Sequence, residues 1–84
     1  MVREGDYVAV FHSVHRVLRA EKILKEAGAS FCLIPAPRQI SADCGLALSF
    51  ASDVRAEIEA LLCRADLPIV ALWTMQSGAY KPAT

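Results

Sequence analysis

The central stretch of the chain reads Ser30-Phe31-Cys32-Leu33-Ile34, then PAPRQISADCG at residues 35–45, then Leu46-Ala47-Leu48-Ser49-Phe50. The first segment is apolar and β-prone, and the last alternates large apolar with small residues, which is typical of a strand with one buried face. The prolines of the middle segment offer no amide to a hydrogen-bond ladder and exclude a regular strand or helix there. The sequence therefore predicts two strands, joined by an irregular loop that ends in Cys44-Gly45.

Further elements follow on both sides of this stretch. Residues 7–11 are β-prone and apolar on both faces, which predicts a strand. From Ser13 the apolar positions recur at helical spacing, with Ser13 suited to the N-cap and Gly28 to the left-handed residue after the last turn. A second helix is expected to start at Ser52-Asp53 and to end before Leu67-Pro68, and the last strand is expected at residues 69–75.

This order of elements is strand, helix, strand, strand, helix, strand. It predicts an α+β fold, the ferredoxin-like βαββαβ two-layer sandwich, with an antiparallel four-stranded sheet ordered 4-1-3-2 and two helices on one face. We expect a single domain over residues 1–76. Residues 77–84 contain little apolar material and are expected to form a flexible C-terminal tail.

Composition limits the possible partners. The 84 residues include 55% hydrophobic residues, above the usual 45–50%, and the sheet face without helices is apolar, so we expect a homodimer through that open face. The net charge of zero argues against nucleic acid or an anionic membrane as partner. No apolar run approaches the roughly 20 residues of a membrane span, and charged residues precede the first apolar run, so we expect a cytoplasmic protein. Three cysteines without a close-spaced pair suggest neither a disulfide framework nor a metal site.

The predicted topology brings Cys44 close to the start of the first helix. If the first and third strands are antiparallel neighbours, His12-Ser13 at the end of one lies beside Cys44-Gly45 at the start of the other. The free amides of a helix start favour a thiolate over a thiol, whose reference pKa is about 8.5. Cys44 is therefore a candidate reactive cysteine.

The same helix start is rich in cations. His12, His15, Arg16 and Arg19 stand where acidic residues are normally favoured, and Arg38 of the loop could join them. Cations and free amides together make an anion site. The alternative is a solvated basic helix face that pairs with acidic residues of the same helix, Glu21 and Glu26.

Other polar residues allow two interpretations each. Cys32 lies in an apolar strand, which favours a small buried side chain. Cys63, near the end of the second helix, is either a resolving thiol for Cys44 or a chance surface thiol. His12 is either a proton acceptor for Cys44 or a pocket wall, and Asp43 opposes a thiolate unless it turns away to bond loop amides.

Two segments of the chain resemble a known bacterial family. They are Phe11-His12-Ser13-Val14-His15 with Leu18-Arg19-Ala20-Glu21, and residues 35–48 from Pro35 through Cys44-Gly45. This pattern is similar to DUF3343, described as selenium/sulfur carrier proteins. The resemblance implies that Cys44 carries sulfur or selenium as a persulfide or selenosulfide, and that Arg38, Ser41 and Gly45 shape its loop. It implies donor and acceptor proteins, such as a cysteine desulfurase, as partners. We expect no cofactor and no metal.

Two other classes of function fit the same elements. A regulatory domain that binds a small ligand between subunits would not require Cys44, and an interaction module would use the apolar sheet face alone. A true enzyme is less favoured, because no second catalytic group stands at a recognisable spacing and the chain is small for enclosing a substrate.

Overall fold

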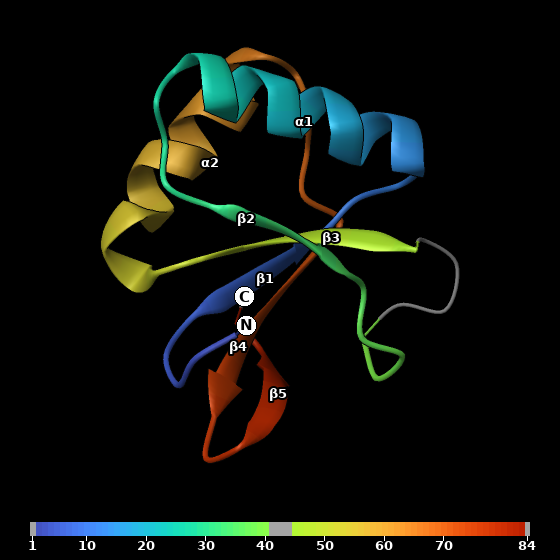
Figure 1. Cartoon of the computed structure of the whole chain (residues 1–84), viewed down its shortest axis with the longest axis vertical. Coiled ribbons are helices and arrows are strands. Elements are labelled where there is room, and N and C mark those ends of the chain that lie inside the picture. Colours follow the sequence, from blue (N-terminus) through green and yellow to red (C-terminus); the bar gives the residue numbers. More distant parts are fainter. Residues whose placement is uncertain (1, 41–44, 84) are drawn as a thin grey trace.

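The computed structural model describes residues 2–40 and 45–83. Its elements are β1 (Tyr7–Val10), α1 (Val14–Glu26), β2 (Cys32–Pro35), β3 (Leu46–Phe50), a 3₁₀ helix η1 (Ser52–Val54), α2 (Arg55–Arg64), β4 (Ala71–Gln76) and β5 (Ala79–Pro82). Figure 1 shows both helices on one side of the sheet and the β4–β5 hairpin extending away from them. The fold is α+β, as predicted.

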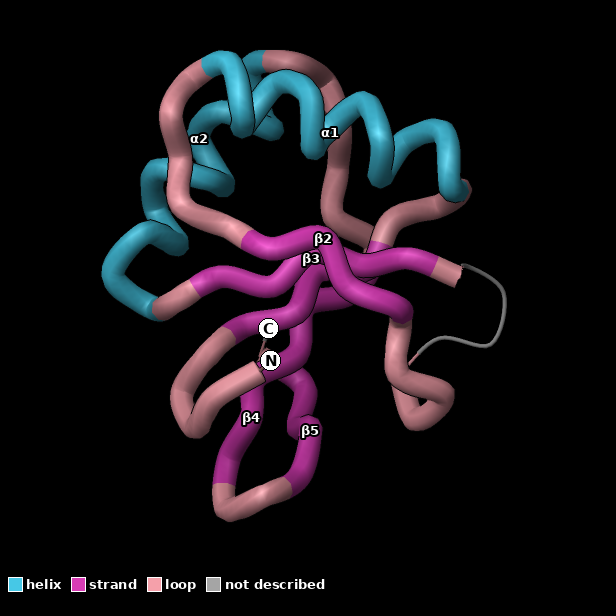
Figure 2. Tube along the Cα trace, in the orientation of Figure 1, coloured by secondary structure: helices cyan, strands magenta, loops and turns pink. Residues whose placement is uncertain are grey.

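All neighbouring strands of the sheet are antiparallel, in the order β2-β3-β1-β4-β5. The first four strands keep the predicted order, with β1 in the centre between β3 and β4 (Figure 2). The predicted number of four strands is wrong, because β5 pairs with the outer edge of β4.

Strand β5 follows a tight turn at Ser77-Gly78. Both residues have positive φ, 54° and 77°, which characterises the two-residue type I′ turn whose twist matches that of the flanking strands. The carboxylate of Glu4 accepts the N–H of Ser77 at 2.6 Å and that of Gly78 at 3.4 Å. Residues 77–84, expected to be a flexible tail, thus contribute an edge strand.

Helix α1 has the predicted ends. The Oγ of Ser13 accepts the N–H of Arg16 at 3.3 Å, and Ser13 itself is extended, as an N-cap should be. Gly28 has φ +75°, and the N–H groups of Gly28 and Ala29 bond the carbonyls of Lys25 and Leu24. This is the Schellman arrangement, which satisfies the last carbonyls of a helix.

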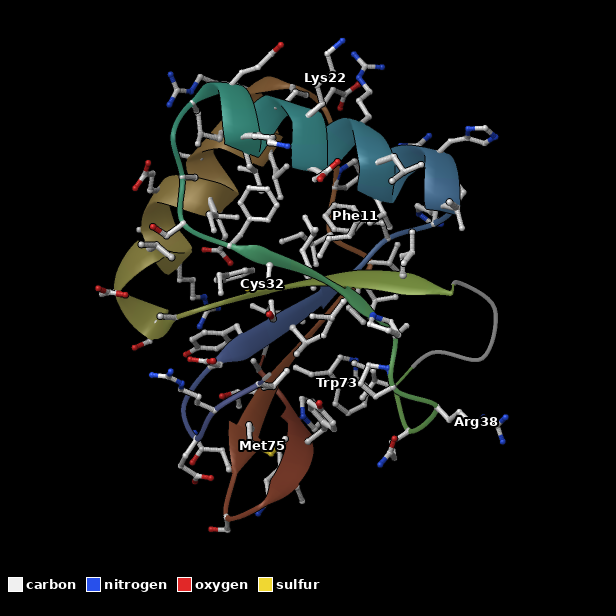
Figure 3. The ribbon with its side chains drawn as sticks, in the orientation of Figure 1. Phe11, Lys22, Cys32, Arg38, Trp73 and Met75 are labelled. Carbon is white, nitrogen blue, oxygen red and sulfur yellow. The ribbon has the colours of Figure 1, made fainter. Side chains whose placement is uncertain are left out.

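The main core lies between the helices and the sheet. Side chains from both helices, from β1, β3 and β4, and from the segments just after β1 and α2 form it: Ala9, Phe11, Val17, Ala20, Leu24, Leu48, Phe50, Ile58, Leu62, Leu67 and Leu72. Figure 3 shows Phe11 between α1 and the sheet. The periodic apolar positions of the two helices thus face the sheet, as the helical spacing predicts.

The sheet face without helices is covered in part by the chain itself. A second buried cluster forms there from Val8, Val10, Ile40 and Ala47, with Val2, Ile34, Ala36, Ala71, Trp73 and Tyr80 packed against it. The expectation that this face is bare is therefore wrong, because the loop after β2 and side chains of β4 and β5 fold over it. A homodimer stays a prediction and loses this support.

Candidate functional site

The predicted site lies at one edge of the sheet, where β1 and β2 end and β3 and β4 begin. Pro35 pairs with Leu46 as the last residues of the β2–β3 ladder. Immediately beyond them, the N–H of Ala36 donates to the carbonyl of Gly45 at 3.0 Å. The two ends of the loop are thus held together at its base.

The strand register brings the start of α1 to this edge. The β1–β3 pairing joins Ala9 to Leu48, and the same register, if extended by three residues past the end of β1, would set His12 opposite Gly45. His12 is exposed, and Ser13 follows it as the helix cap. The predicted juxtaposition of the helix start with Gly45 agrees with this register.

Three predicted loop residues, Ser41, Asp43 and Cys44, lie outside the described residues. The chain before them is anchored at Ile40, which is 9% exposed and belongs to the second buried cluster. The N–H of Ile40 donates to the carbonyl of Pro37 at 3.1 Å, which closes a turn over residues 37–40. The first half of the loop therefore packs on the sheet face that carries no helix.

Two backbone N–H groups at the start of α1 have no acceptor among the described residues. The first turn contains no acidic residue, and the Ser13 hydroxyl accepts a hydrogen bond from the backbone N–H of Arg16 only. The N–H groups of Val14 and His15 have no hydrogen-bond partner within residues 2–40 and 45–83. Amides of this kind carry the partial positive charge of a helix N-terminus and favour an anion.

The basic residues of α1 face a shallow hollow between the two helices. His15, Arg16 and Arg19 line one side of this hollow of about 380 Å³, and residues 65–67 after α2 line the other. Among the described residues, the one ion pair within 4.0 Å is Arg55 with Glu59 on α2. The alternative in which the α1 cations pair with Glu21 and Glu26 is therefore not realised in the described structure.

Asp66 in this hollow was not predicted from the sequence. It has φ +57°, and its N–H and that of Leu67 bond the carbonyls of Cys63 and Leu62. Asp66 thus ends α2 as Gly28 ends α1, in the same Schellman arrangement. A short polar residue just after the last apolar helix position was the available signal, since aspartate tolerates the left-handed region.

Arg38 is separated from the other predicted cations. It is exposed on the turn over residues 37–40, and Figure 3 shows its side chain pointing away from the protein. Ile40 holds this turn on the face opposite α1. The structure therefore does not bring Arg38 to the group formed by His15 and Arg16.

The two described cysteines are both exposed. For Cys32 this contradicts the predicted burial, because β2 is an edge strand and Cys32 points to the face without helices, next to Ser49 of β3. Cys63 lines a different hollow of about 330 Å³ with Glu59, Asp66 and other residues of the α2 end. Its role as a resolving thiol stays untested, since its proposed partner lies outside the described residues.

Two further properties concern cofactors and membranes. The described residues contain no cluster of three or more His, Cys, Asp or Glu side chains able to hold a metal ion. Neither described helix combines the length and apolar character needed to cross a bilayer.

The indole N–H of Trp73, next to the second cluster, is buried and has no hydrogen-bond partner among the described residues.

Comparison with known families identifies the chain. A family model described as "Putative Se/S carrier protein-like" matches residues 6–74. The chain belongs to this family. The match confirms the resemblance noted from the residues around Ser13 and Cys44, and it spans every element from β1 into β4. Strand β5 lies beyond the part that the family model matches.

Neither the curated proteins nor the solved structures give a match to this chain.

Proposed function

We propose that this protein carries sulfur or selenium on Cys44, as a persulfide or selenosulfide, and passes it to a partner protein. The observation that carries the proposal is the family match, joined to the antiparallel pairing that brings the end of β1, just before His12, beside the start of β3, just after Cys44 and Gly45. We also interpret the fold as a ferredoxin-like sandwich with one strand added next to β4, because the order of the first four strands agrees with it.

The start of α1 supports the proposal on electrostatic grounds. A terminal sulfur or selenium atom on a cysteine is an anion in the reactive form, and it needs donors or positive charge nearby. The amides of Val14 and His15, which have no partner among the described residues, stand at the start of α1, and Arg16 follows in the same first turn. These groups would stabilise the loaded form of the carrier.

The proposed transfer needs no external oxidant. The Cys44 thiolate attacks the terminal sulfur of a persulfide on a donor protein, the new bond joins Cys44 to that sulfur, and the donor cysteine leaves as a thiolate. In the second step a nucleophile of the acceptor attacks the same terminal sulfur, and Cys44 leaves as a thiolate. The selenium version exchanges a terminal selenium atom in the same way.

A donor protein must dock beside α1 to reach this edge. Val14 and Leu18 are 41% and 42% exposed and lie one helical turn apart, with Arg16 and Arg19 exposed on the same segment. An apolar pair flanked by cations suits a partner with an apolar contact and an acidic rim. A homodimer through the sheet remains part of the proposal, and size-exclusion chromatography with light scattering tests it.

The deciding experiment measures the intact mass of the protein after incubation with a cysteine desulfurase and either cysteine or selenocysteine, so that the donor cysteine carries the terminal sulfur or selenium atom. We expect the wild type to gain one sulfur or selenium atom that a reducing agent removes. Cys44→Ser should gain none, while Cys32→Ser and Cys63→Ser, which remove the two other thiols one at a time, should load like the wild type.

Two results would reject the carrier proposal centred on Cys44. One is a wild type that takes up neither element, and the other is equal loading of Cys44→Ser. A small-ligand-binding regulatory module or an interaction module of the same fold would then be the better interpretation, since neither requires Cys44.

A further inference from the structure

A second thiol lies at the opposite end of the sheet from the loop. Cys32 begins β2, three residues before Pro35, and a strand rises about 3.3 Å per residue, so roughly 10 Å of strand separates it from the base of the loop. The thiol is exposed, and Figure 3 shows it on β2, away from Arg38. Nothing in the proposed carrier cycle uses this residue.

Cys32 opens into a hollow of about 520 Å³ where β1 and β2 begin and β3 ends. The polar side chains that line this hollow, here named the Cys32 hollow, come from Arg3, Asp6, Ser30, Cys32 and Ser49. Ser49 is paired directly opposite Cys32 in the β2–β3 register. The hollow therefore places a thiol, two hydroxyls and one charge of each sign within one open space.

The hydroxyl of Ser49 indicates that a polar ligand fits this space. Ser49 is only 5% exposed and lines the hollow. Its hydroxyl makes no hydrogen bond within the part of the chain that the structure describes. A hydroxyl without a protein partner, on a side chain that is otherwise buried, is available to donate to or accept from a ligand in the hollow.

The two charged side chains of the hollow, Arg3 and Asp6, indicate which charged groups a ligand there should carry. Arg3 makes no ion pair among the described residues, and its guanidinium can bind a carboxylate through two parallel hydrogen bonds. Asp6 is fixed, since its Oδ2 accepts the backbone N–H of Arg3 at 3.0 Å, and it can accept bonds from an ammonium group. A carboxylate and an ammonium together are the two ends of an α-amino acid.

We propose that Cys32 is a site of reversible mixed-disulfide formation with small disulfides that carry amino-acid ends, the class of oxidised glutathione and cystine. The Cys32 thiolate attacks one sulfur of the small disulfide, a new disulfide joins Cys32 to that half, and the other half leaves as a thiolate. The small disulfide is the oxidant, and it is reduced by one thiol equivalent. Excess reduced small thiol reverses the step.

Cys63 provides an internal comparison within the same chain. It is exposed like Cys32, but the charged residues that line its hollow are Glu59 and Asp66, and no cation lines it. The Cys63 hollow therefore lacks the guanidinium that can bind a carboxylate beside Cys32. The charge of the disulfide should therefore decide which cysteine reacts.

The test uses the full chain with Cys44→Ser, in which Cys32 and Cys63 are the remaining thiols. The protein is treated with oxidised glutathione, which is anionic, or with cystamine, which is cationic, and the adducts are located by peptide mass mapping. We expect glutathione to modify Cys32 about five times faster than Cys63, and cystamine to lose or reverse this preference. Because this variant lacks Cys44, the outcome is independent of the proposed carrier function.

Two variants show whether Arg3 of the Cys32 hollow causes the preference of glutathione for Cys32. Arg3→Gln should bring the two rates with glutathione within about twofold of each other, as expected when one nearby charge is lost. Lys22→Gln removes the same charge from the outer side of α1, far from Cys32 in Figure 3, and should leave the preference unchanged. Equal rates at both cysteines in the parent, faster reaction at Cys63, or an equal effect of both variants would overturn the proposal.

Discussion

The carboxylate of Glu4 accepts the backbone N–H of Ser77 at 2.6 Å, although 73 positions of sequence separate the two residues. The same carboxylate reaches the N–H of Gly78 at 3.4 Å. Both amides point toward it because both residues of the turn have positive φ. The start of the chain thus holds the hairpin that adds the unpredicted strand to the sheet.

Glu4→Gln should loosen this hairpin, because the neutral amide keeps the shape of the side chain and loses the charge-assisted bonds. We expect a loss of about 1 kcal/mol in the free energy of unfolding, less than for a buried charged pair, since the turn is exposed. Urea denaturation measures the loss, and hydrogen exchange at Lys81 reports the hairpin alone. Glu26→Gln, an exposed glutamate of α1, is the control, and an equal loss in both variants would contradict the role given to Glu4.

Gly28→Ala should destabilise the end of α1. A Cβ at this position would meet no atom within 4 Å, so the cost comes only from holding alanine at φ +75°. That cost is about 1 kcal/mol. Thermal and urea denaturation should both show it, and an unchanged midpoint would mean that the helix end relaxes to another conformation without cost.

Asp66→Gly should stabilise the protein, the opposite of the effect of Gly28→Ala, because Asp66 holds in α2 the position that Gly28 holds in α1. Asp66 has φ +57°, and glycine adopts this left-handed conformation without strain. Glycine also raises the conformational entropy of the unfolded chain, which offsets part of the stabilisation. We expect a net stabilisation of about 0.5 kcal/mol. A loss of stability would show that the Asp66 carboxylate is held by the basic residues that share its hollow, His15, Arg16 and Arg19.

The elements predicted correctly from the sequence are those fixed by local rules. Ser13 and Gly28 end α1 where capping chemistry demands it, and residues 46–50 form a strand with the predicted bounds. Strand β5 was missed because part of what holds its turn, Glu4, lies at the other end of the chain. The exposure of Cys32 was missed because apolar periodicity does not tell which strand forms the edge of a sheet.

The candidate site was also predictable only in part, because some of its geometry follows from the order of elements and some depends on tertiary contacts. The order of elements predicts that the end of β1 lies beside the start of β3, and the observed strand order and register agree with this. The separation of Arg38 from these residues follows from the packing of Ile40 on the other sheet face. The packing of Ile40 on the sheet is a tertiary contact, and no local sequence pattern in the loop predicts it.

Ile40→Ala should release the first half of the loop. Ile40 is 9% exposed and packs in the second cluster, so its truncation should cost about 2 kcal/mol, at the lower end for a core residue because a loop can relax into the space. Trp73 borders the same cluster and is the one tryptophan of the chain, so its fluorescence should shift to longer wavelength. Leu33→Ala is the control, since Leu33 is 36% exposed and should lose much less stability without a spectral shift.

Gly45→Ala separates folding from transfer, and this prediction depends on the proposed carrier function. Gly45 is exposed, its φ lies outside the left-handed region, and a Cβ there would meet no atom within 4 Å, so stability should change by less than about 0.5 kcal/mol. A residue without a side chain next to Cys44 leaves room for the backbone of a docked partner. We therefore expect loading from a desulfurase to slow about tenfold, as overpacking a contact does, while loading from a small persulfide is unchanged. Equal slowing with both donors would show instead that the methyl group perturbs Cys44 itself.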